Sequence, residues 1–363
     1  MAYPVSVIQA TVDSGDVATN QHHMVELIAG AVARGARLIV LPEACISDIF
    51  RGAAELAETI PGPSTELVSR VAGDAVVALP LLERAAGGAV YSSCALVARD
   101  GIRGVARKAH LFRDPMGHDS FRDAESLSAG SELSIFEIND LRVGVLIGFD
   151  AEFPESFRAL ALRGADLIIV ALNQLNPDTS FLSSMALRNR VPLLVANRIG
   201  FRRMYPGVPE FSALTMSLVQ DKDGSFLARC RGGSVILDAN GSALAEPSQN
   251  LQRDLETLAG APPAAIIPLA HFQQDEVLNA SFRLDELRVQ RLTSPFIAER
   301  REELYRTVPV ETATPVLAPP PETAETAQSG VENLAQPVSP EPVSKTKTAK
   351  PKRKRATKTR NAP

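Results

Sequence analysis

The stretch LRVGVLIGFDAEFPESFRALALRGADLIIV, residues 141–170, decides the fold of this 363-residue chain. Residues 141–147 are nearly all apolar, which is typical of a strand that is buried on both faces. From Phe153 to Ala161, apolar residues recur at the spacing of one helix face. Gly164 ends that helix, and a second apolar strand begins at residue 167. The order of strand, tight turn, helix and strand predicts an α/β fold.

The tight turn after the first strand falls on Gly148. Enzymes of the α/β class often place a nucleophile at such a turn. Glycine has no side chain and cannot attack a substrate, although it relieves backbone strain in a sharp turn. The turn therefore has the setting of a nucleophile without the nucleophile itself.

The segment Gly144–Ile168 resembles the nucleophile segment of the nitrilase superfamily, the carbon–nitrogen hydrolases. That family hydrolyses amides, nitriles and carbamoyl compounds with a Glu–Lys–Cys triad, and its turn reads Ile-Cys-Tyr-Asp or a close variant. This chain has Ile147-Gly148-Phe149-Asp150 instead. The resemblance implies that Gly148 stands where the family has its cysteine, and that Phe149 contacts the substrate.

Two further motifs resemble those that carry the rest of the triad. Leu38-Ile-Val-Leu-Pro-Glu43 resembles the strand that ends in the general-base glutamate, although a solvated carboxylate at a strand end would look the same. Arg107-Lys-Ala-His-Leu-Phe112 resembles the family's lysine motif. The resemblance gives Lys108 the role of stabilising the oxyanion, because a fixed ammonium stabilises negative charge in a dry pocket. We expect His110 to be a structural hydrogen-bonding group.

Two softer assignments complete the candidate site. The segment Phe121–Gly130 resembles the one that often carries a second glutamate, and that position falls on Asp123. Aspartate is one methylene shorter, and catalytic geometry is sensitive to such a shift. Asn173 follows a strand, and substrate contacts commonly come from strand ends. We expect no metal and no cofactor.

Several other elements can be placed from the sequence. A helix is expected after Asn20, which suits a helix N-cap, and it should end at Gly35. The segment 201–215 is expected to be a surface loop, although Arg202 within it could line a pocket. A last strand is expected over residues 264–269. One amphipathic or charged helix is expected over 285–305, and it could pack against a second subunit.

The composition indicates a globular protein of the cytoplasm. The three cysteines, Cys45, Cys94 and Cys230, are unpatterned, which suits a reducing compartment. No uncharged apolar run reaches the roughly 18 residues of a membrane span. The N-terminus lacks a basic region and a long apolar core, so we expect no signal peptide.

The formal net charge of −4 conceals an asymmetry. Residues 345–363 hold nine Lys and Arg and no acid, so the preceding residues carry −13. Residues 307–344 are rich in Pro, Ala, Thr and Glu and are expected to be disordered. The sequence thus predicts a nitrilase-like domain over 1–306, a disordered linker over 307–344 and a disordered basic tail over 345–363.

The family resemblance implies a four-layer α-β-β-α sandwich that forms a homodimer or higher homo-oligomer. Three functions remain open. The first is a pseudoenzyme that keeps Glu43 and Lys108 and binds a small amide or carboxylate, or acts as a scaffold. The second is an active amidase with an altered mechanism, in which Glu43 activates a positioned water molecule or Cys45, the only conceivable stand-in residue, acts as the nucleophile. The third is a protein that associates with nucleic acid or an acidic partner through its basic tail, although a solubilising tail or one that folds back on the acidic body would look the same in sequence.

Overall fold

The computed structural model describes residues 2–50, 52–112, 126–204, 219–220, 226–248 and 275–305. The chain divides into one unit over residues 1–301 and another over 302–363. The second unit is described only up to Tyr305 and holds the short 3-10 helix Glu302–Leu304. The predicted linker and basic tail, 307–344 and 345–363, lie outside the described residues, so their disorder stays a prediction.

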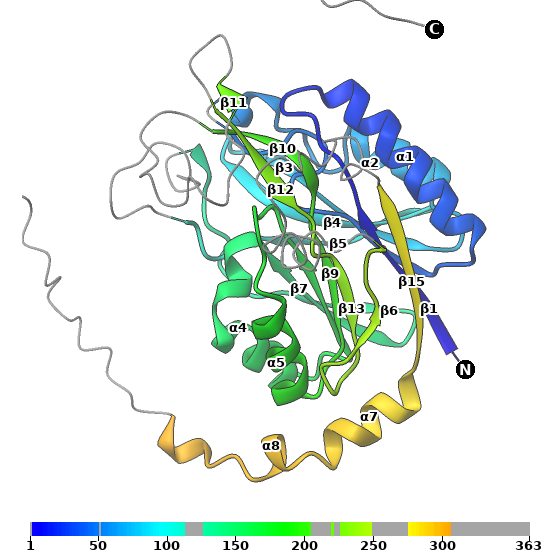
Figure 1. Cartoon of the computed structure of the whole chain (residues 1–363), viewed down its shortest axis with the longest axis vertical. Coiled ribbons are helices and arrows are strands. Elements are labelled where there is room, and N and C mark those ends of the chain that lie inside the picture. The colour runs from blue at the N-terminus through cyan, green and yellow to red at the C-terminus, as the bar shows by residue number, and fades with distance from the viewer. Residues whose placement is uncertain are drawn as a thin grey trace, which may run out of the picture. The chain divides into compact units, whose positions relative to one another are not determined.

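The first unit contains two six-stranded mixed sheets (Figure 1). In the first sheet the order is β15-β1-β2-β3-β4-β5. Its strands are β1 (Ala2–Gln9), β2 (Leu38–Val40), β3 (Val76–Arg84), β4 (Val90–Ala98), β5 (Gly101–Arg107) and β15 (Glu276–Arg283). Strands β1, β2 and β3 are parallel to one another, and the other pairs are antiparallel.

The second sheet follows the same plan, with the order β14-β13-β9-β8-β7-β6. Its strands are β6 (Ile135–Ile138), β7 (Leu141–Ile147), β8 (Leu167–Ala171), β9 (Leu193–Ala196), β13 (Val235–Leu237) and β14 (Ala243–Ala245). Strands β7, β8 and β9 are parallel. The stretch 141–170 therefore forms a strand–helix–strand unit inside this sheet, with β7 beside the edge strand β6, and the unit is the one its sequence predicts.

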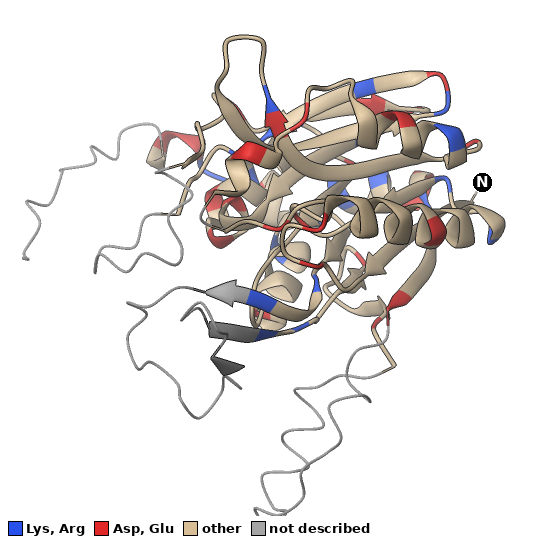
Figure 2. Ribbon diagram, turned by 90° about the horizontal axis from the view of Figure 1, so that it is seen from above, with Lys and Arg blue, Asp and Glu red and all other residues tan. Residues whose placement is uncertain are grey.

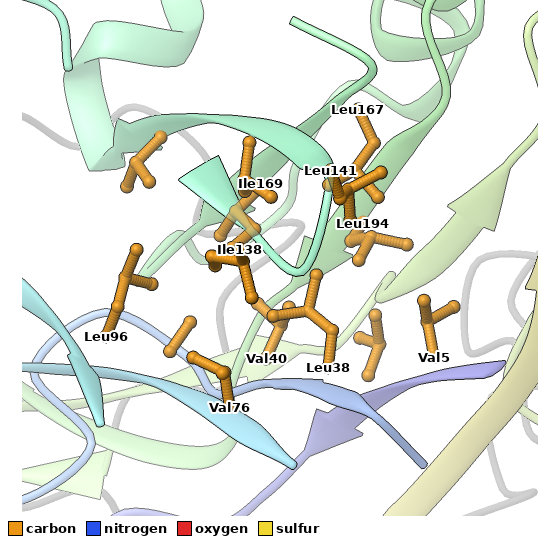
Figure 3. Close-up of a cluster of buried hydrophobic side chains, with 14 of the residues drawn as sticks. Val5, Leu38, Val40, Val76, Leu96, Ile138, Leu141, Leu167, Ile169 and Leu194 are labelled. Atoms are coloured by element: carbon orange, nitrogen blue, oxygen red, sulfur yellow. The ribbon is translucent and has the colours of Figure 1, made fainter. Parts of the chain in front are cut away.

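Helices cover the outer face of each sheet. On the first sheet, α1 (Val17–Ala33) and α2 (Pro63–Val71) pack their apolar residues against the strands. On the second sheet, α4 (Pro154–Leu162) and α5 (Thr179–Asn189) do the same. The inner faces of the two sheets share one apolar core (Figure 3). The layers are thus helix, sheet, sheet and helix, which is the predicted four-layer sandwich.

The alternation of side chains along the strands explains why the two sheets pack together. In β7, Val143, Val145 and Ile147 enter the core between the sheets, while Leu146 faces the helices. A strand points successive side chains to opposite faces, so a nearly continuous apolar run fills two cores at once. In Figure 2 the strands are mostly tan, and charged residues gather at strand ends and in helices and loops.

The remaining described elements include a small third sheet and a C-terminal helical segment. The third sheet has the order β10-β12-β11, from β10 (Ile199–Met204), β11 (Val219–Gln220) and β12 (Phe226–Arg231). Helices α7 (Leu284–Leu292) and α8 (Pro295–Ala298) follow β15. Two short 3-10 helices are η1 (Ala53–Leu56) and η2 (Gly148–Glu152). None of the helices in the described ranges has the length and hydropathy of a membrane span.

Three sequence-based expectations are corrected by the structure. Helix α1 begins at Val17 and is capped by Asp16, so Asn20 lies inside the helix and is not its N-cap. The loop expected over 201–215 is wrong for residues 201–204, which belong to β10. The single helix expected over 285–305 is broken into α7, α8 and the 3-10 helix Glu302–Leu304, and the ring of Pro295 prevents α7 from continuing into α8. The strand expected over 264–269 lies outside the described residues.

Candidate active site

Four of the predicted site residues follow strands of both sheets. Lys108 and Gly148 come directly after β5 and β7. Glu43 begins the turn that follows β2, and Asn173 follows β8. The structure brings these four residues and Phe149 to the wall of one cavity of about 510 Å³. The wall also includes Ile49, Phe112, Leu175, Glu152, Gln174 and Arg202. Asp123 lies outside the described residues.

Glu43 and Lys108 form a buried ion pair in this cavity. The Lys108 Nζ lies 3.0 Å from the Glu43 Oε1, and each residue is 3% exposed. Ser92 Oγ donates to the same oxygen at 3.1 Å. The main-chain N–H of Lys108 donates to the Ser92 carbonyl at 2.9 Å, which fixes the lysine beside the glutamate. A buried charge pair needs such extra hydrogen bonds to offset its lost hydration.

Gly148 lies directly against the Glu43 carboxylate. Its φ of +51° is in the left-handed region that favours glycine. A Cβ built on Gly148 would come within 2.7 Å of Glu43 Oε1 and closer still to Oε2. The carboxylate therefore occupies the space in which a side chain at position 148 would begin.

Asp150 holds the lysine and glycine segments together. Its Oδ1 accepts from the main-chain N–H groups of His110, at 2.8 Å, and Ala109, at 3.1 Å. Its Oδ2 accepts from the Ile147 N–H at 3.2 Å. His110 Nδ1 is 2.8 Å from Asp150 Oδ1, and its ring stacks on Phe153. His110 thus takes the structural hydrogen-bonding place that the sequence predicts.

A second buried charge cluster lies behind Asn173. Asn173 Nδ2 donates to Asp48 Oδ1 at 2.8 Å, and Arg198 Nη1 is 2.6 Å from Asp48 Oδ2. Asp48 and Arg198 are fully buried. Burial alone would raise the pKa of Asp48, but the charges of Arg198 and Arg202, with hydrogen bonds from Ser14 and Asn173, outweigh it and hold the pKa below its usual range. Asp48 is therefore ionised near neutral pH.

Sequence reasoning missed part of this arrangement. It favoured a surface loop for Arg202 and kept a place in a pocket as the alternative; the alternative is correct, because the residue is 6% exposed, lines the cavity and donates to the Asn173 carbonyl at 3.0 Å. It gave no role to Asp48, although an acid within the largely apolar stretch 44–50 is a signal of a buried charge. The partner Arg198 is 150 residues away in sequence, so local patterns could not pair them.

Cys45 is badly placed to act as a nucleophile. It is fully buried in the apolar core between the first sheet and its helices, and its Sγ donates to the Pro80 carbonyl at 3.3 Å. Burial raises the pKa of its thiol, which disfavours the thiolate form that attacks. Cys94 is likewise buried, with a pKa raised by burial to about 12.

The described residues offer no group of three or more His, Cys, Asp or Glu side chains arranged to hold a metal ion. The chemistry that the cavity itself can perform rests on a carboxylate, an ammonium, a guanidinium and an amide. Such groups can bind and polarise a small polar ligand, and the carboxylate can take a proton.

The sequence of the chain is similar to those of known proteins. The "Carbon-nitrogen hydrolase" family model matches residues 4–255. A probable nitrilase of Schizosaccharomyces pombe is 34% identical over 177 residues, covering 45% of this chain and 61% of the relative. An omega-amidase of Danio rerio is 36% identical over 148 residues, covering 39% and 53%. The chain thus spans little more than half the length of these relatives.

Solved structures agree on the fold. A carbon-nitrogen hydrolase from Helicobacter pylori G27 superposes with a TM-score of 0.64 at 21% identity, over 84% of this chain and 97% of that one. Nit3 of Saccharomyces cerevisiae gives a TM-score of 0.60 at 18% identity, over 82% and 97%. Since the family model also matches well over half of the sequence, the chain belongs to the carbon-nitrogen hydrolase family.

Proposed function

We propose that this chain is a carbon-nitrogen hydrolase homologue that binds a small amide or carboxylate in the Glu43–Lys108 cavity and has lost covalent catalysis. The observation that carries the proposal is the contact of the Glu43 carboxylate with Gly148. Gly148 occupies the turn at which the family resemblance expects a cysteine. Covalent catalysis needs a nucleophile that attacks the amide or nitrile carbon, and glycine supplies none.

The cavity keeps what a binding site requires. Its buried ammonium and carboxylate can meet complementary groups of a ligand, and Phe112, Phe149 and Ile49 offer an apolar wall. A mixture of apolar wall and a few fixed polar groups is typical of small-molecule sites. The relatives named omega-amidase and nitrilase support amides and related compounds as the ligand class.

Loss of a nucleophile that acts together with its partners typically lowers the rate by several orders of magnitude. We therefore expect the native chain to release no ammonia from ω-amido acids, simple amides, carbamoyl compounds or nitriles above the level of Glu43→Gln. The same compounds should still bind, as measured by ligand-observed NMR. Circular dichroism would first establish that Glu43→Gln is folded.

Turnover by the native chain that disappears in Glu43→Gln and Lys108→Ala would contradict the proposal. It would instead favour an active hydrolase in which Glu43 activates a water molecule. Gly148→Cys is informative only in one direction. A gain of activity would support an intact cavity, whereas silence would follow equally from the close approach of Glu43 to position 148.

A further inference from the structure

The side-chain amide of Asn173 has a hydrogen-bond partner at its nitrogen but none at its oxygen among the described residues. Asn173 is 4% exposed and lines the cavity. Its Nδ2 donates to Asp48 Oδ1 at 2.8 Å. Its Oδ1 is buried and accepts no hydrogen bond from the described residues. A buried acceptor without a donor is unfavourable, so the site is incomplete at this atom.

Asp48 fixes the direction in which this amide points. The carboxylate is held by Arg198 at 2.6 Å, by Ser14 Oγ at 2.6 Å and by the Ile49 main-chain N–H at 2.7 Å. An ionised carboxylate can only accept hydrogen bonds, so Asn173 must present its nitrogen to Asp48. A flip of the Asn173 side-chain amide would place its oxygen against the Asp48 carboxylate, and both of these atoms are hydrogen-bond acceptors. The oxygen is therefore the polar atom that Asn173 has left for a ligand.

The other groups that line the cavity indicate which class of ligand fits beside Asn173. The Glu43 main-chain N–H donates to the Leu172 carbonyl at 3.0 Å, which places Glu43 beside the segment that carries Asn173. Both residues line the same cavity. Lys108 and Arg202 also line it, together with a second carboxylate on Glu152, so the charged side chains of the wall balance and favour neither a cation nor an anion by net charge. A neutral group with N–H donors suits this combination better than an ammonium does.

We propose that Asn173 Oδ1 accepts a hydrogen bond from an amide N–H of the ligand, so that the cavity selects a primary carboxamide over the carboxylate of the same shape. This inference rests on the proposed function, in which the cavity binds a small amide or carboxylate. A carboxylate in the same position would set an oxygen against the Asn173 oxygen and leave both without a proton between them.

The test compares matched pairs of ligands on the full chain. Butyramide is compared with butyrate, and glutaramate with glutarate, by NMR titration at neutral pH. We expect the native chain to bind each amide more tightly than its carboxylate by on the order of tenfold or more. In Asn173→Leu, which keeps a similar volume and removes the acceptor, the preference should fall to near unity.

Asn189 provides a matched control. It lies at the end of α5, its Oδ1 is also buried without a partner, and its Nδ2 donates to the Met185 carbonyl at 2.8 Å. It does not line the cavity. Asn189→Leu makes the same chemical change elsewhere and should leave the amide preference unaltered.

The outcomes separate this inference from the function on which it rests. Binding of amides and carboxylates with equal affinity by the native chain overturns the inference and leaves cavity binding intact. Retention of the amide preference in Asn173→Leu assigns the selection to another residue and also overturns it. If none of the four compounds binds the native chain, cavity binding of this ligand class is wrong, and the inference falls with it. The native chain alone decides the first and third outcomes, even if the variant does not fold.

Discussion

At the scale of single residues, the backbone of Gly148 lies directly against the side-chain carboxylate of Glu43. The glycine has a left-handed backbone, and the carboxylate of Glu43 lies where a side chain would start. A substitution at position 148 should therefore destabilise the protein in two ways, through the backbone conformation and through the contact with Glu43. These two contributions can be measured separately, because another glycine of this chain has only the first.

Gly148→Ala is expected to lower the free energy of unfolding more than Gly35→Ala does. Gly35 also has a positive φ, +84°, but nothing lies within 4 Å of a Cβ built there. Both variants should lose about 1–2 kcal/mol from the left-handed conformation, and only Gly148→Ala must also displace a held carboxylate. Urea denaturation measures both. Equal losses, or an excess that persists when Glu43 is replaced by Ala, would contradict the assignment.

Some residues of the candidate site can be predicted from the sequence, and others cannot. The strand-end motifs predict Glu43 and Lys108 in one site, and the structure places the two side chains 3.0 Å apart. The cluster of Asp48 with Arg198 was not predictable, because each residue belongs to a different sheet region and no local pattern links them. Buried charges far apart in sequence are paired by the tertiary fold alone.

At the scale of elements, the apolar periodicity of residues 141–170 predicts β7, α4 and β8 well. Predictions failed where a polar side chain or a proline decided an element's boundary. Asp16 caps α1 by accepting from the Thr19 N–H at 3.1 Å, one turn earlier than the sequence suggests. Strand β15 went unnoticed because its residues 276–283 alternate between polar and apolar only loosely at the edge of a sheet.

Helix α7 is fixed to the second sheet by Asp166, which directly precedes β8. Arg288 donates to both carboxylate oxygens of Asp166, at 3.0 and 2.8 Å. The Arg142 N–H donates to the same carboxylate at 3.0 Å. Burial would raise the pKa of Asp166, but these donors and the charge of Arg291 outweigh it and hold the pKa below its usual value. The carboxylate is thus bound in its ionised form.

Asp166→Asn should destabilise the protein by about 1–3 kcal/mol at pH 7. A folded-state pKa below the unfolded value means that the contribution of Asp166 is present above the unfolded pKa of about 3.9 and is lost as pH falls through the folded pKa. The difference between native chain and variant should therefore shrink below about pH 4. Urea denaturation at a series of pH values measures this difference. Arg34→Gln, on the exposed end of α1, serves as a control without such a pH dependence. A constant difference down to pH 3 would contradict the role of Asp166.

At the scale of the whole molecule, the candidate site belongs to neither sheet alone. Glu43 and Lys108 follow strands of the first sheet, whereas Gly148 and Asn173 follow strands of the second. The shared core between the sheets therefore sets the geometry of the cavity. The sequence predicts this layering only through the family resemblance, since periodicity identifies buried strands but does not say which sheets face each other.

The asymmetry of charge leads to a prediction for the full chain. The basic tail, 345–363, should bind duplex DNA weakly and with strong salt dependence, because Lys and Arg displace counterions from phosphates. A chain that ends at residue 344 keeps the acidic remainder and should lose this binding in a gel-shift assay. An unchanged shift after the deletion would exclude the tail as the contact. The tail holds no aromatic residue for base stacking, so little sequence preference is expected.

The pairing of β1 with β15 has a consequence for how the protein is made. Ser6 on β1 hydrogen-bonds Asn279 on β15, 273 residues later in the chain. A ribosome releases β1 first and β15 near the end of the first unit, so β1 must wait with one edge unpaired through most of translation. An unpaired strand edge is a template for wrong pairing between chains. Nascent chains stalled before residue 276 should therefore be the form of this protein that depends most on chaperones.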